Sequence, residues 1–594
     1  MAIFKHFTYI IFVLIPMYAF AEQAALSDST ISPEWATYGN GLHNQRHSQL
    51  KDINAENVHK MKLAWKYRTG KVGTFQTSPL VVDDIMYFST PFNDVVALDA
   101  FNGNELWRYQ HELTRTKTCC GPANRGVAIA GNKVYQATID GRLIALDKEN
   151  GKVVWETVIK DSSLNIQKNL SSLQTTDLTD EFSTAKMVGG TGHSFNMAPQ
   201  VFDGMVFVGS TGAGYGLHLD TDKGLVVIDG GDDQTGLRGF IAAFDQGTGE
   251  ELWRWYSVPG EEWIGDWVEA TSAGVDLNRN IALEKADADT FKSNWKLGGG
   301  SIWTTPAIDE ETGLMFFGTG NPSPNMESST RPGDNLNTCS IVALDASTGK
   351  LKWAFQQVPH DRWGYDVASP VVLIEVLHNG EKVKAVGQAG KTGWFYILNR
   401  ETGELLYKSE PFVPQSNLFA NPTEEGVKIY PAIDGGSNWS PVAVDPNKND
   451  VFIAGVHLPT TYFKKILPST PTSPWKSYTY FEMDYKSKYG LLSSIDLDTG
   501  KVNWQHKTQN PLIGGVLHTA GDLVFSGEGS GEFFALDAKS GEKRWSAKTA
   551  YGVNAPPVSY QAKGKQFVVV AAGGNKLQGY PVGDEVLVYA LPEN

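Results

Sequence analysis

ALDASTGKLKW (residues 343–353) is one copy of a pattern that recurs along the chain and decides its fold. An apolar run ends in Asp345, a tight turn follows with Gly349, and a second run carries Trp353. An Asp can hold such a turn by bonding backbone N–H groups, a Gly accepts positive φ, and the aromatic ring packs against a neighbour. The stretch is therefore predicted to be a β-hairpin.

Seven copies of this hairpin can be read, at residues 97–107, 145–155, 243–253, 343–353, 397–407, 494–504 and 535–545. A second series of hairpins precedes the turns, as in SPLVVDDIMYF (78–88), and longer members begin at Ser369 and Ala555, which makes eight. Two hairpins give four antiparallel strands, the usual blade of a β-propeller. The sequence thus predicts an all-β protein, an eight-bladed β-propeller.

The last of these units lacks its own Gly turn and Trp, because the chain runs out at VLVYALPEN (586–594). The early segment MKLAWKY (61–67) has the missing residue types. We expect it to pair as the outer strand of the last blade, which would close the ring and leave no open sheet edge. The motif aromatics are assigned to packing, and function is sought in loops at one end of the ring.

The N-terminus has the features of a cleaved secretory signal. A weakly basic start precedes an apolar core from Tyr9 to Met17 and a small-x-small site, Ala19-Phe20-Ala21. The apolar core is too short for a membrane span, and no comparable run follows. We expect residues 1–21 to be removed, and residues 22–594 to form a single propeller domain in the periplasm without a membrane span.

The net charge limits the classes of partner that the protein can bind, and the cysteines have two possible chemical states. With 51 Lys and Arg against 66 Asp and Glu, the formal charge of −15 argues against nucleic-acid or anionic-membrane partners. Two of the three cysteines, Cys119 and Cys120, are adjacent. In an oxidising compartment they either bond to each other, in a strained ring that makes a flat platform, or are two free or separately paired thiols.

TCCGPANRG, set between the first two predicted blades, carries a family resemblance. The chain is similar to the pyrroloquinoline-quinone (PQQ)-dependent methanol and ethanol dehydrogenases over about residues 33 to 594, and the similar motifs include GGSIW (299–303), GTGNPSPNMESSTRPGDN (318–335) and PHDRW (359–363). The resemblance implies oxidation of an alcohol by hydride transfer to PQQ. It also implies a Cys119–Cys120 disulfide on one face of the quinone and Trp303 on the other.

The resemblance assigns further cofactor contacts. Arg125 matches an Arg whose planar fork suits a cofactor carboxylate, and Thr211 and Asn438 match residues that hydrogen-bond the quinone. Lys391, in AGKTGWFYILNR, matches the basic residue at the reactive quinone oxygens, which is also Lys in the glucose-dehydrogenase branch. A cation at those oxygens would stabilise negative charge as the quinone accepts hydride. Lys391 is therefore a candidate catalytic residue.

The chain departs from the family at its acidic positions. Members bind a calcium or lanthanide ion beside the quinone through a Glu, an Asn and often an Asp, and a further Asp acts as base. Asn321 matches the Asn, but Gly214 and Gly364 stand where the Glu and the catalytic Asp are expected. Asp366 matches an additional metal-binding Asp of lanthanide-using members.

Two hypotheses follow from these departures. In the first, Asp366 serves as metal ligand, base or both, and the insertion between Tyr215 and Arg238 either adds ligands or is a solvated acidic loop; its candidates are Asp220, Asp222, Asp229, Asp232 and Asp233. In the second, the site has drifted, and the protein is a non-catalytic or metal-free quinone binder or a periplasmic scaffold. The retained cysteine pair, Arg125, Trp303 and Lys391 favour the enzyme.

The sequence contains no CxxCH motif, so no covalent haem is expected. Electrons would leave through a separate carrier such as a periplasmic cytochrome c, whose basic face would complement this acidic protein. The substrate is predicted only as an alcohol-type small molecule.

Overall fold

The predicted turn chemistry is present in detail in the hairpin of residues 343–353. Strand β19 (Ser340–Asp345) pairs antiparallel with β20 (Leu351–Gln356), and Trp353 lies opposite Ala343. The backbone N–H of Gly349, at φ +68°, donates to the carbonyl of Asp345 at 2.8 Å, and the N–H of Thr348 donates to its carboxylate at 3.0 Å. The Asp and Gly of the motif therefore close the turn that the sequence predicts.

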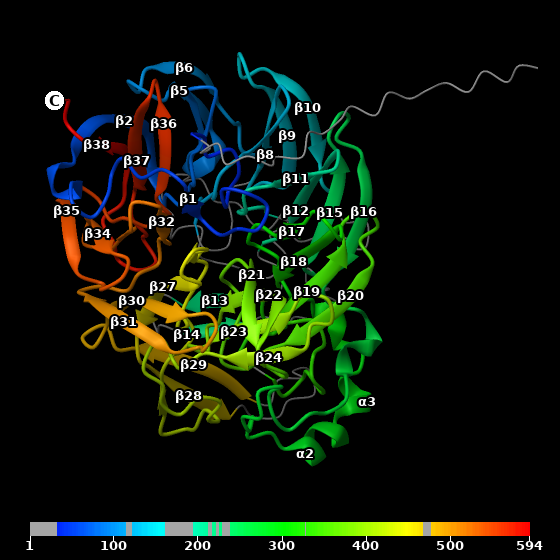
Figure 1. Cartoon of the computed structure of the whole chain (residues 1–594). Helices are drawn as coiled ribbons and strands as arrows, with labels where there is room; N and C mark the ends of the chain where they lie inside the picture. Colours follow the sequence, from blue (N-terminus) through cyan, green and yellow to red (C-terminus); the bar gives the residue numbers. More distant parts are fainter. Residues whose placement is uncertain are drawn as a thin grey trace, which may run out of the picture.

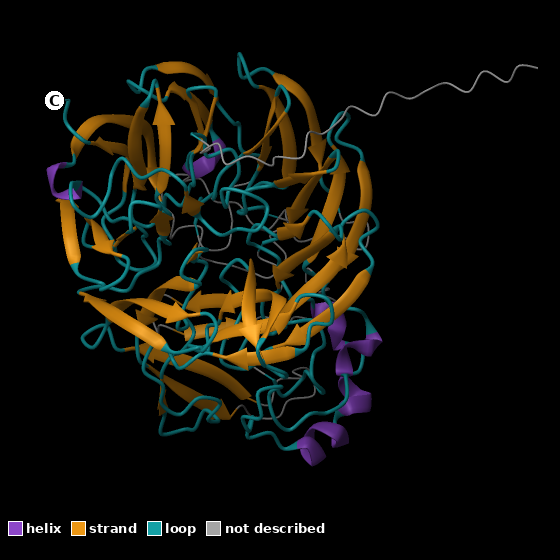
Figure 2. Cartoon of the chain, viewed as in Figure 1, coloured by secondary structure: helices purple, strands orange, loops and turns teal. Residues whose placement is uncertain are grey.

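The structure is a computed structural model and describes residues 33–114, 121–160, 194–211, 217–220, 225–228, 238–326, 328–466 and 477–593. The predicted signal peptide and the Cys119-Cys120 pair lie outside these residues. Within them the protein is dominated by strands arranged around a common centre, in chain order, with the short helices α2 (Ile281–Ala286) and α3 (Ala288–Phe291) at the periphery (Figures 1 and 2). The all-β prediction is confirmed.

In the described part of the chain, seven sheets contain four antiparallel strands each, and an eighth contains four antiparallel strands and the short β1 (His47–Ser48), which pairs parallel with β32. In sheet order they are β3 (Leu80–Val82), β4 (Ile85–Ser89), β5 (Val95–Asp99) and β6 (Glu105–Tyr109); β7 (Ala128–Ala130), β8 (Lys133–Ala137), β9 (Arg142–Asp147) and β10 (Val153–Val158); β11 (Gln200–Phe202), β12 (Met205–Gly209), β15 (Phe240–Asp245) and β16 (Glu251–Tyr256); β17 (Ala307–Asp309), β18 (Leu314–Gly318), β19 and β20; β21 (Val372–His378), β22 (Glu381–Ala389), β23 (Phe395–Asn399) and β24 (Leu405–Lys408); β26 (Ala443–Asp445), β27 (Asp450–His457), β30 (Tyr489–Asp496) and β31 (Val502–Thr508); β32 (Leu517–Thr519), β33 (Leu523–Gly527), β34 (Glu532–Asp537) and β35 (Lys543–Lys548); and β36 (Val558–Ala562), β37 (Lys565–Ala572), β38 (Gly583–Ala590) and β2 (Lys62–Gly73).

Several smaller elements lie outside these eight sheets. They are the hairpin of β13 (Leu217–Asp220) and β14 (Leu225–Ile228), the sheet of β25 (Val427–Ile429), β28 (Thr460–Ile466) and β29 (Ser477–Met483), the helices α2 (Ile281–Ala286) and α3 (Ala288–Phe291), and the 3₁₀ turns Val58–Lys60, Pro91–Asn93, Glu261–Ile264 and Asn294–Leu297. No helix in the described part of the chain is long and apolar enough to cross a membrane.

The motif Trp of one sheet packs on the motif Gly of the next sheet. Trp253 of β16 lies against Gly349, so close that a Cβ on the glycine would be 2.5 Å from the indole ring. The same indole donates to the carbonyl of Ala346 at 3.1 Å. Gly151 and Trp107, and Gly541 and Trp504, repeat this contact. The hairpin motif therefore makes both the turn and the joint between neighbouring sheets.

This joint gives a stability prediction for Gly349→Ala. The substitution places a side chain at positive φ and against Trp253, and we expect it to cost about 3 kcal/mol of the free energy of unfolding. Gly313 is the matched control, because it has φ +67° but no atom within 4 Å of the place that a Cβ would take, so Gly313→Ala should cost only about 1 kcal/mol. Urea unfolding measures both costs. Equal unfolding midpoints for the two variants would show that the contact between Gly349 and Trp253 does not stabilise the protein.

A strand from the N-terminal part of the chain and a strand near its C-terminus pair in one sheet. β2 pairs antiparallel with β38, with Trp65 opposite Val588, and Figure 1 shows the blue β2 beside the red C-terminal strands. Trp65 also lies against Gly103, in the position that a motif Trp takes toward the next sheet. An N-terminal strand thus supplies the outer edge of the C-terminal sheet.

Residues 42–48 form a segment that the repeat does not predict, and we call it the crossing segment. Its carbonyl groups accept hydrogen bonds from β17, β21, β26 and β32, the first strands of four successive sheets. Arg46 at its centre is fully buried and donates to the carbonyls of Tyr38, Val516 and Pro557. The crossing segment therefore joins the first strands of sheets that lie far apart in the sequence.

Candidate functional site

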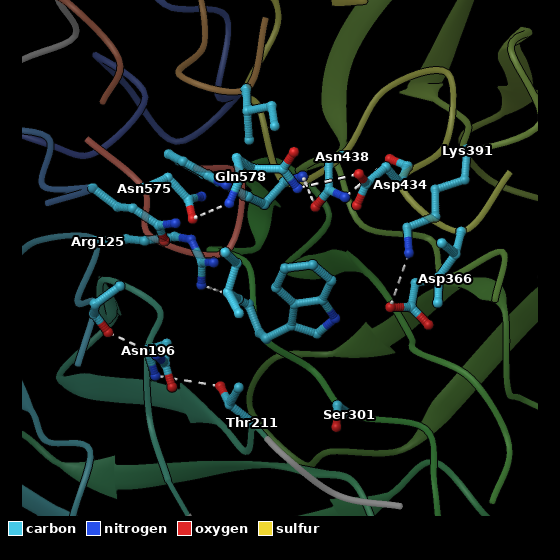
Figure 3. A pocket seen from close by; sticks show the side chains of 17 residues that line it. Arg125, Asn196, Thr211, Ser301, Asp366, Lys391, Asp434, Asn438, Asn575 and Gln578 are labelled. Carbon is cyan, nitrogen blue, oxygen red and sulfur yellow. Dashed lines mark hydrogen bonds and ion pairs between the residues drawn. The ribbon is translucent and has the colours of Figure 1, made fainter. Parts of the chain in front are cut away.

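Loops from sheets far apart in the sequence enclose a cavity of about 230 Å³ (Figure 3). The residues that line it are Gln76, Ala123, Arg125, Asn196, Thr211, Ser301, Trp303, Asp366, Lys391, Ile433, Asp434, Asn438, Trp439, Ile513, Asn575, Leu577 and Gln578. Most are polar or aromatic, and the charged ones are two cations and two carboxylates. This composition suits a flat, polar small molecule.

Six residues predicted from the sequence line this one cavity: Arg125, Thr211, Trp303, Asp366, Lys391 and Asn438. Asn321 does not line it but lies directly behind, where its backbone N–H donates to Asp366. Cys119, Cys120 and Gly214 lie outside the described residues. The structure therefore brings the predicted residues together, while their individual roles stay predictions.

Arg125 is a buried cation that faces the cavity. Its guanidinium lies 5.1 Å from the centre of the Trp303 ring and 4.8 Å from that of Trp439, and Nη1 donates to the Trp303 carbonyl at 3.0 Å. Nε has no hydrogen-bond partner, and no carboxylate among the described residues pairs with the guanidinium. Burial lowers the pKa of Arg125 to about 10, a sign of a charge that lacks its counter-ion.

Thr211 and Asn196 form the part of the cavity wall next to Arg125. The N–H of Thr211 donates to the carbonyl of Ser194 at 2.7 Å, and the N–H of Asn196 donates to the Thr211 hydroxyl at 3.3 Å. The Asn196 carbonyl in turn accepts from the backbone N–H of Arg125 at 2.9 Å. This chain of bonds fixes the positions of Thr211 and Arg125 relative to each other.

Lys391 and Asp366 form an ion pair in the opposite wall (Figure 3). Both are buried, and Lys391 Nζ lies 3.4 Å from Asp366 Oδ2 and donates to the Gly364 carbonyl at 2.9 Å. Asp366 Oδ1 accepts from the backbone N–H of Asn321 at 2.7 Å. Burial raises the pKa of the Asp366 carboxyl, and the Lys391 ammonium opposes that rise.

Asn321 is engaged by a second carboxylate, that of Asp361. Asn321 Nδ2 donates to Asp361 Oδ2 at 2.7 Å. The other hydrogen bonds to the Asp361 carboxylate come from the backbone N–H groups of Trp363, Gly364 and Tyr365, at 3.1–3.2 Å. Asp361 therefore holds the turn in which Gly364 stands, and its oxygen atoms are already occupied.

The described residues do not fit a calcium or lanthanide ion. Such an ion takes about six to eight oxygen ligands. In the described part of the chain, no three His, Cys, Asp or Glu side chains converge, and Asp366 already bonds an N–H group and an ammonium. Among the predicted extra donors, Asp222, Asp229, Asp232 and Asp233 lie outside the described residues, and only the backbone of Asp220 is described, in β13.

Comparison with known proteins decides the family. Residues 35–418 and 473–568 match the family described as "PQQ: Glucose/ethanol/alcohol dehydrogenase, beta-propeller domain". The chain belongs to this quinoprotein dehydrogenase family. A similar relative is the quinohemoprotein alcohol dehydrogenase of Comamonas testosteroni, 34% identical over 92% of this chain and 74% of the relative. Another is the quinoprotein ethanol dehydrogenase of Pseudomonas aeruginosa, 31% identical over 93% of this chain and 87% of the relative.

Solved structures of the quinoprotein dehydrogenases have the same fold. The crystal structure of the Comamonas testosteroni protein superimposes with a TM-score of 0.75 at 30% identity, over 96% of this chain and 83% of that one. A europium-containing methanol dehydrogenase superimposes with a TM-score of 0.74 at 26% identity, over 94% of this chain and 98% of that one. The β-propeller prediction is confirmed by these likenesses.

Within this quinoprotein, Gly364 occupies a position where a side chain would be strained. Its φ is +90°, and a Cβ there would lie 2.9 Å from Ile433 Cγ1. The carboxylate that the family resemblance led us to expect at this position would therefore strain the backbone and displace Ile433.

Sequence reasoning missed several residues of the site. They are Asp434, Trp439, Asn196, Gln76, Asn575 and Gln578 in the lining, and Asp361 behind it. Asp434 and Trp439 flank Asn438 in IDGGSNW, and Asp361 lies in PHDRW, so that both motifs contained a signal. The other residues lie in segments without a motif.

Proposed function

We propose that this chain oxidises an alcohol-type substrate by hydride transfer to PQQ bound in the cavity. The observation that carries the proposal is Arg125, a buried guanidinium that faces the cavity between two indole rings and has no carboxylate partner among the described residues. A planar, anionic cofactor satisfies both features, because its carboxylate pairs with the guanidinium and its rings stack on the indole surface.

PQQ, when bound, supplies the two-electron acceptor of the reaction. Arg125 and Trp303 would hold it, with Thr211 and Asn438 as hydrogen-bonding partners. The Lys391 ammonium is kept in place by the Gly364 carbonyl and by Asp366, so that a fixed positive charge borders the space where the reaction takes place. Fixed charge of this kind stabilises negative charge that develops during the reaction.

The architecture and location belong to the same proposal. The eight sheets would be the blades of one propeller domain over residues 22–594, with β2 closing the ring; its pairing with β38 supports this. Residues 1–21 would direct export to the periplasm, where Cys119 and Cys120 could oxidise. A periplasmic cytochrome c would accept the electrons, for which the formal charge of −15 offers an acidic surface.

A binding and turnover experiment tests the proposal. Purified protein is titrated with PQQ and the quenching of tryptophan fluorescence is followed, because Trp303 and Trp439 line the cavity. Dye reduction is then measured with a panel of primary alcohols, secondary alcohols and sugars, without metal and with calcium or lanthanum chloride. We expect saturable quenching and dye reduction with at least one alcohol.

The metal arms of this experiment test the calcium or lanthanide prediction. Turnover that needs either ion would show that ligands outside the described residues complete a metal site. Quenching without turnover under every condition would instead favour the non-catalytic quinone binder, and no quenching would favour a scaffold. An identical titration with NAD is the control and should give no quenching.

A further inference from the structure

One corner of the cavity is built where three segments press together at Gly364, Lys391 and Gly435. Lys391 Nζ donates to the Gly364 carbonyl at 2.9 Å, and the Gly436 N–H donates to the Lys391 carbonyl at 2.7 Å. A Cβ on Gly435 would lie 2.4 Å from Lys391 Cγ, so this loop touches the lysine stem directly. The residue before Gly435 is Asp434, whose side chain lines the cavity.

Asp434 is the less engaged of the two carboxylates in the lining. Its Oδ2 accepts one hydrogen bond, from Gln578 Nε2 at 3.1 Å, and among the described residues no group bonds Oδ1. Asp366, by contrast, uses Oδ1 for the Asn321 N–H and Oδ2 for Lys391. In Figure 3 Asp434 lies on the same wall as Asn438 and is separate from the Lys391–Asp366 pair.

We propose that Asp434 is a catalytic residue, which accepts the proton of the substrate hydroxyl during oxidation. This proposal rests on the proposed function. In the step, the hydroxyl O–H bond breaks and its proton passes to Asp434 Oδ1. The adjacent C–H bond breaks, and its hydrogen leaves with both electrons to the quinone, so that the alcohol becomes a carbonyl compound and the quinone is reduced by two electrons.

The free-energy cost of a proton transfer also favours Asp434 over Asp366. Protonation of Asp366 would break the contact of a buried carboxylate with the Lys391 ammonium and leave a buried cation unpaired, which is costly. Protonation of Asp434 breaks no ion pair that involves a described residue. Asp366 is then a positioning residue, because it holds the ammonium in place.

The surroundings of Asp434 agree with the role of a base. Burial raises the pKa of its carboxyl, and Gln578 and the Lys391 ammonium oppose that rise. General bases work well with a pKa nearer to neutral than that of an ordinary Asp. The other titratable groups that interact with Asp434 are Tyr462, Tyr485 and Tyr580, and the pKa of each is raised, so each stays neutral when Asp434 ionises.

Asp434→Asn tests the proposal, with Asp366→Asn as the matched comparison. Both proteins are loaded with PQQ, and quinone affinity is measured by tryptophan quenching, independently of turnover. For Asp434→Asn we expect kcat/KM to fall about 100-fold, with quinone affinity within about twofold of the wild type. The rise of kcat/KM with pH that marks a base losing its proton should disappear in Asp434→Asn and persist in Asp366→Asn.

Three results would overturn the assignment. They are activity of Asp434→Asn within about threefold of wild type, loss of quinone binding in that variant, and loss of the pH-dependent rise in Asp366→Asn alone. Failure of the proposed function is visible separately, because then the wild-type protein itself binds no quinone or oxidises no alcohol, and the role of Asp434 falls with it.

Discussion

Replacing Lys391 by Gln is expected to lower kcat by about 1,000-fold while quinone binding persists, since a fixed charge that stabilises a developing negative charge contributes on this scale. The Lys391 ammonium is buried beside the cavity and held by the Gly364 carbonyl and Asp366. The substitution removes that charge and leaves Asp366 without its ion-pair partner. Steady-state dye reduction and tryptophan quenching, measured on the same preparations, separate turnover from binding.

Lys352→Gln is the control for this experiment. Lys352 lies in the hairpin of β19 and β20, where it is exposed, pairs with Asp345 at 3.7 Å and does not line the cavity. Its loss should leave kcat unchanged. A Lys391→Gln protein that turns over within about tenfold of wild type would show that the ammonium has no electrostatic role in the reaction.

Replacing Arg125 by Met is expected to change quinone affinity and protein stability in opposite directions. The Kd for PQQ should rise on the order of 1,000-fold, because a buried charge pair with the cofactor is lost. The cofactor-free protein should instead gain about 1 kcal/mol, because the substitution removes a buried cation that has no counter-ion among the described residues. Fluorescence titration and urea unfolding of the cofactor-free protein measure the two effects.

Arg142→Met is the matched control, because it removes an arginine that has carboxylate partners. Arg142, the first residue of β9, is also an arginine but forms ion pairs with Glu156 and, at 3.5 Å, with Asp140. Its substitution should lower stability and leave PQQ affinity unchanged. If Arg125→Met lost stability as Arg142→Met does, Arg125 would be a structural residue. The buried guanidinium would then no longer support a bound anionic cofactor.

The fold could be predicted from the sequence because its information is local. Asp345 and Gly349 make their turn through bonds within five residues, and such bonds can be read from one copy of the motif. The contact of Trp253 with Gly349 could not be read, because it joins two copies across a sheet boundary. The crossing segment was missed for the same reason, since its carbonyl groups bond four sheets and need no particular side chains.

The site could be predicted only as far as its motifs extend. Arg125, Trp303 and Lys391 lie in recognisable stretches, and the structure collects them at one cavity. The relation between Gly364 and Asp434 could not be foreseen. It depends on the approach of Ile433 to within 2.9 Å of a Cβ position 69 residues earlier in the chain, which is a property of the packed loops.

The crossing segment has a consequence for the order in which the chain folds. Arg46 donates to the carbonyls of Val516 and Pro557, which follow it by 470 and 511 residues. Closing loops of this length costs entropy that local hairpins do not, and contacts so distant in sequence slow folding. Until the last two sheets exist, the Arg46 guanidinium has no place to be buried. The crossing segment is therefore among the last parts of the chain to reach its final contacts, and a chain cut short before residue 516 would leave it unburied and open to proteases.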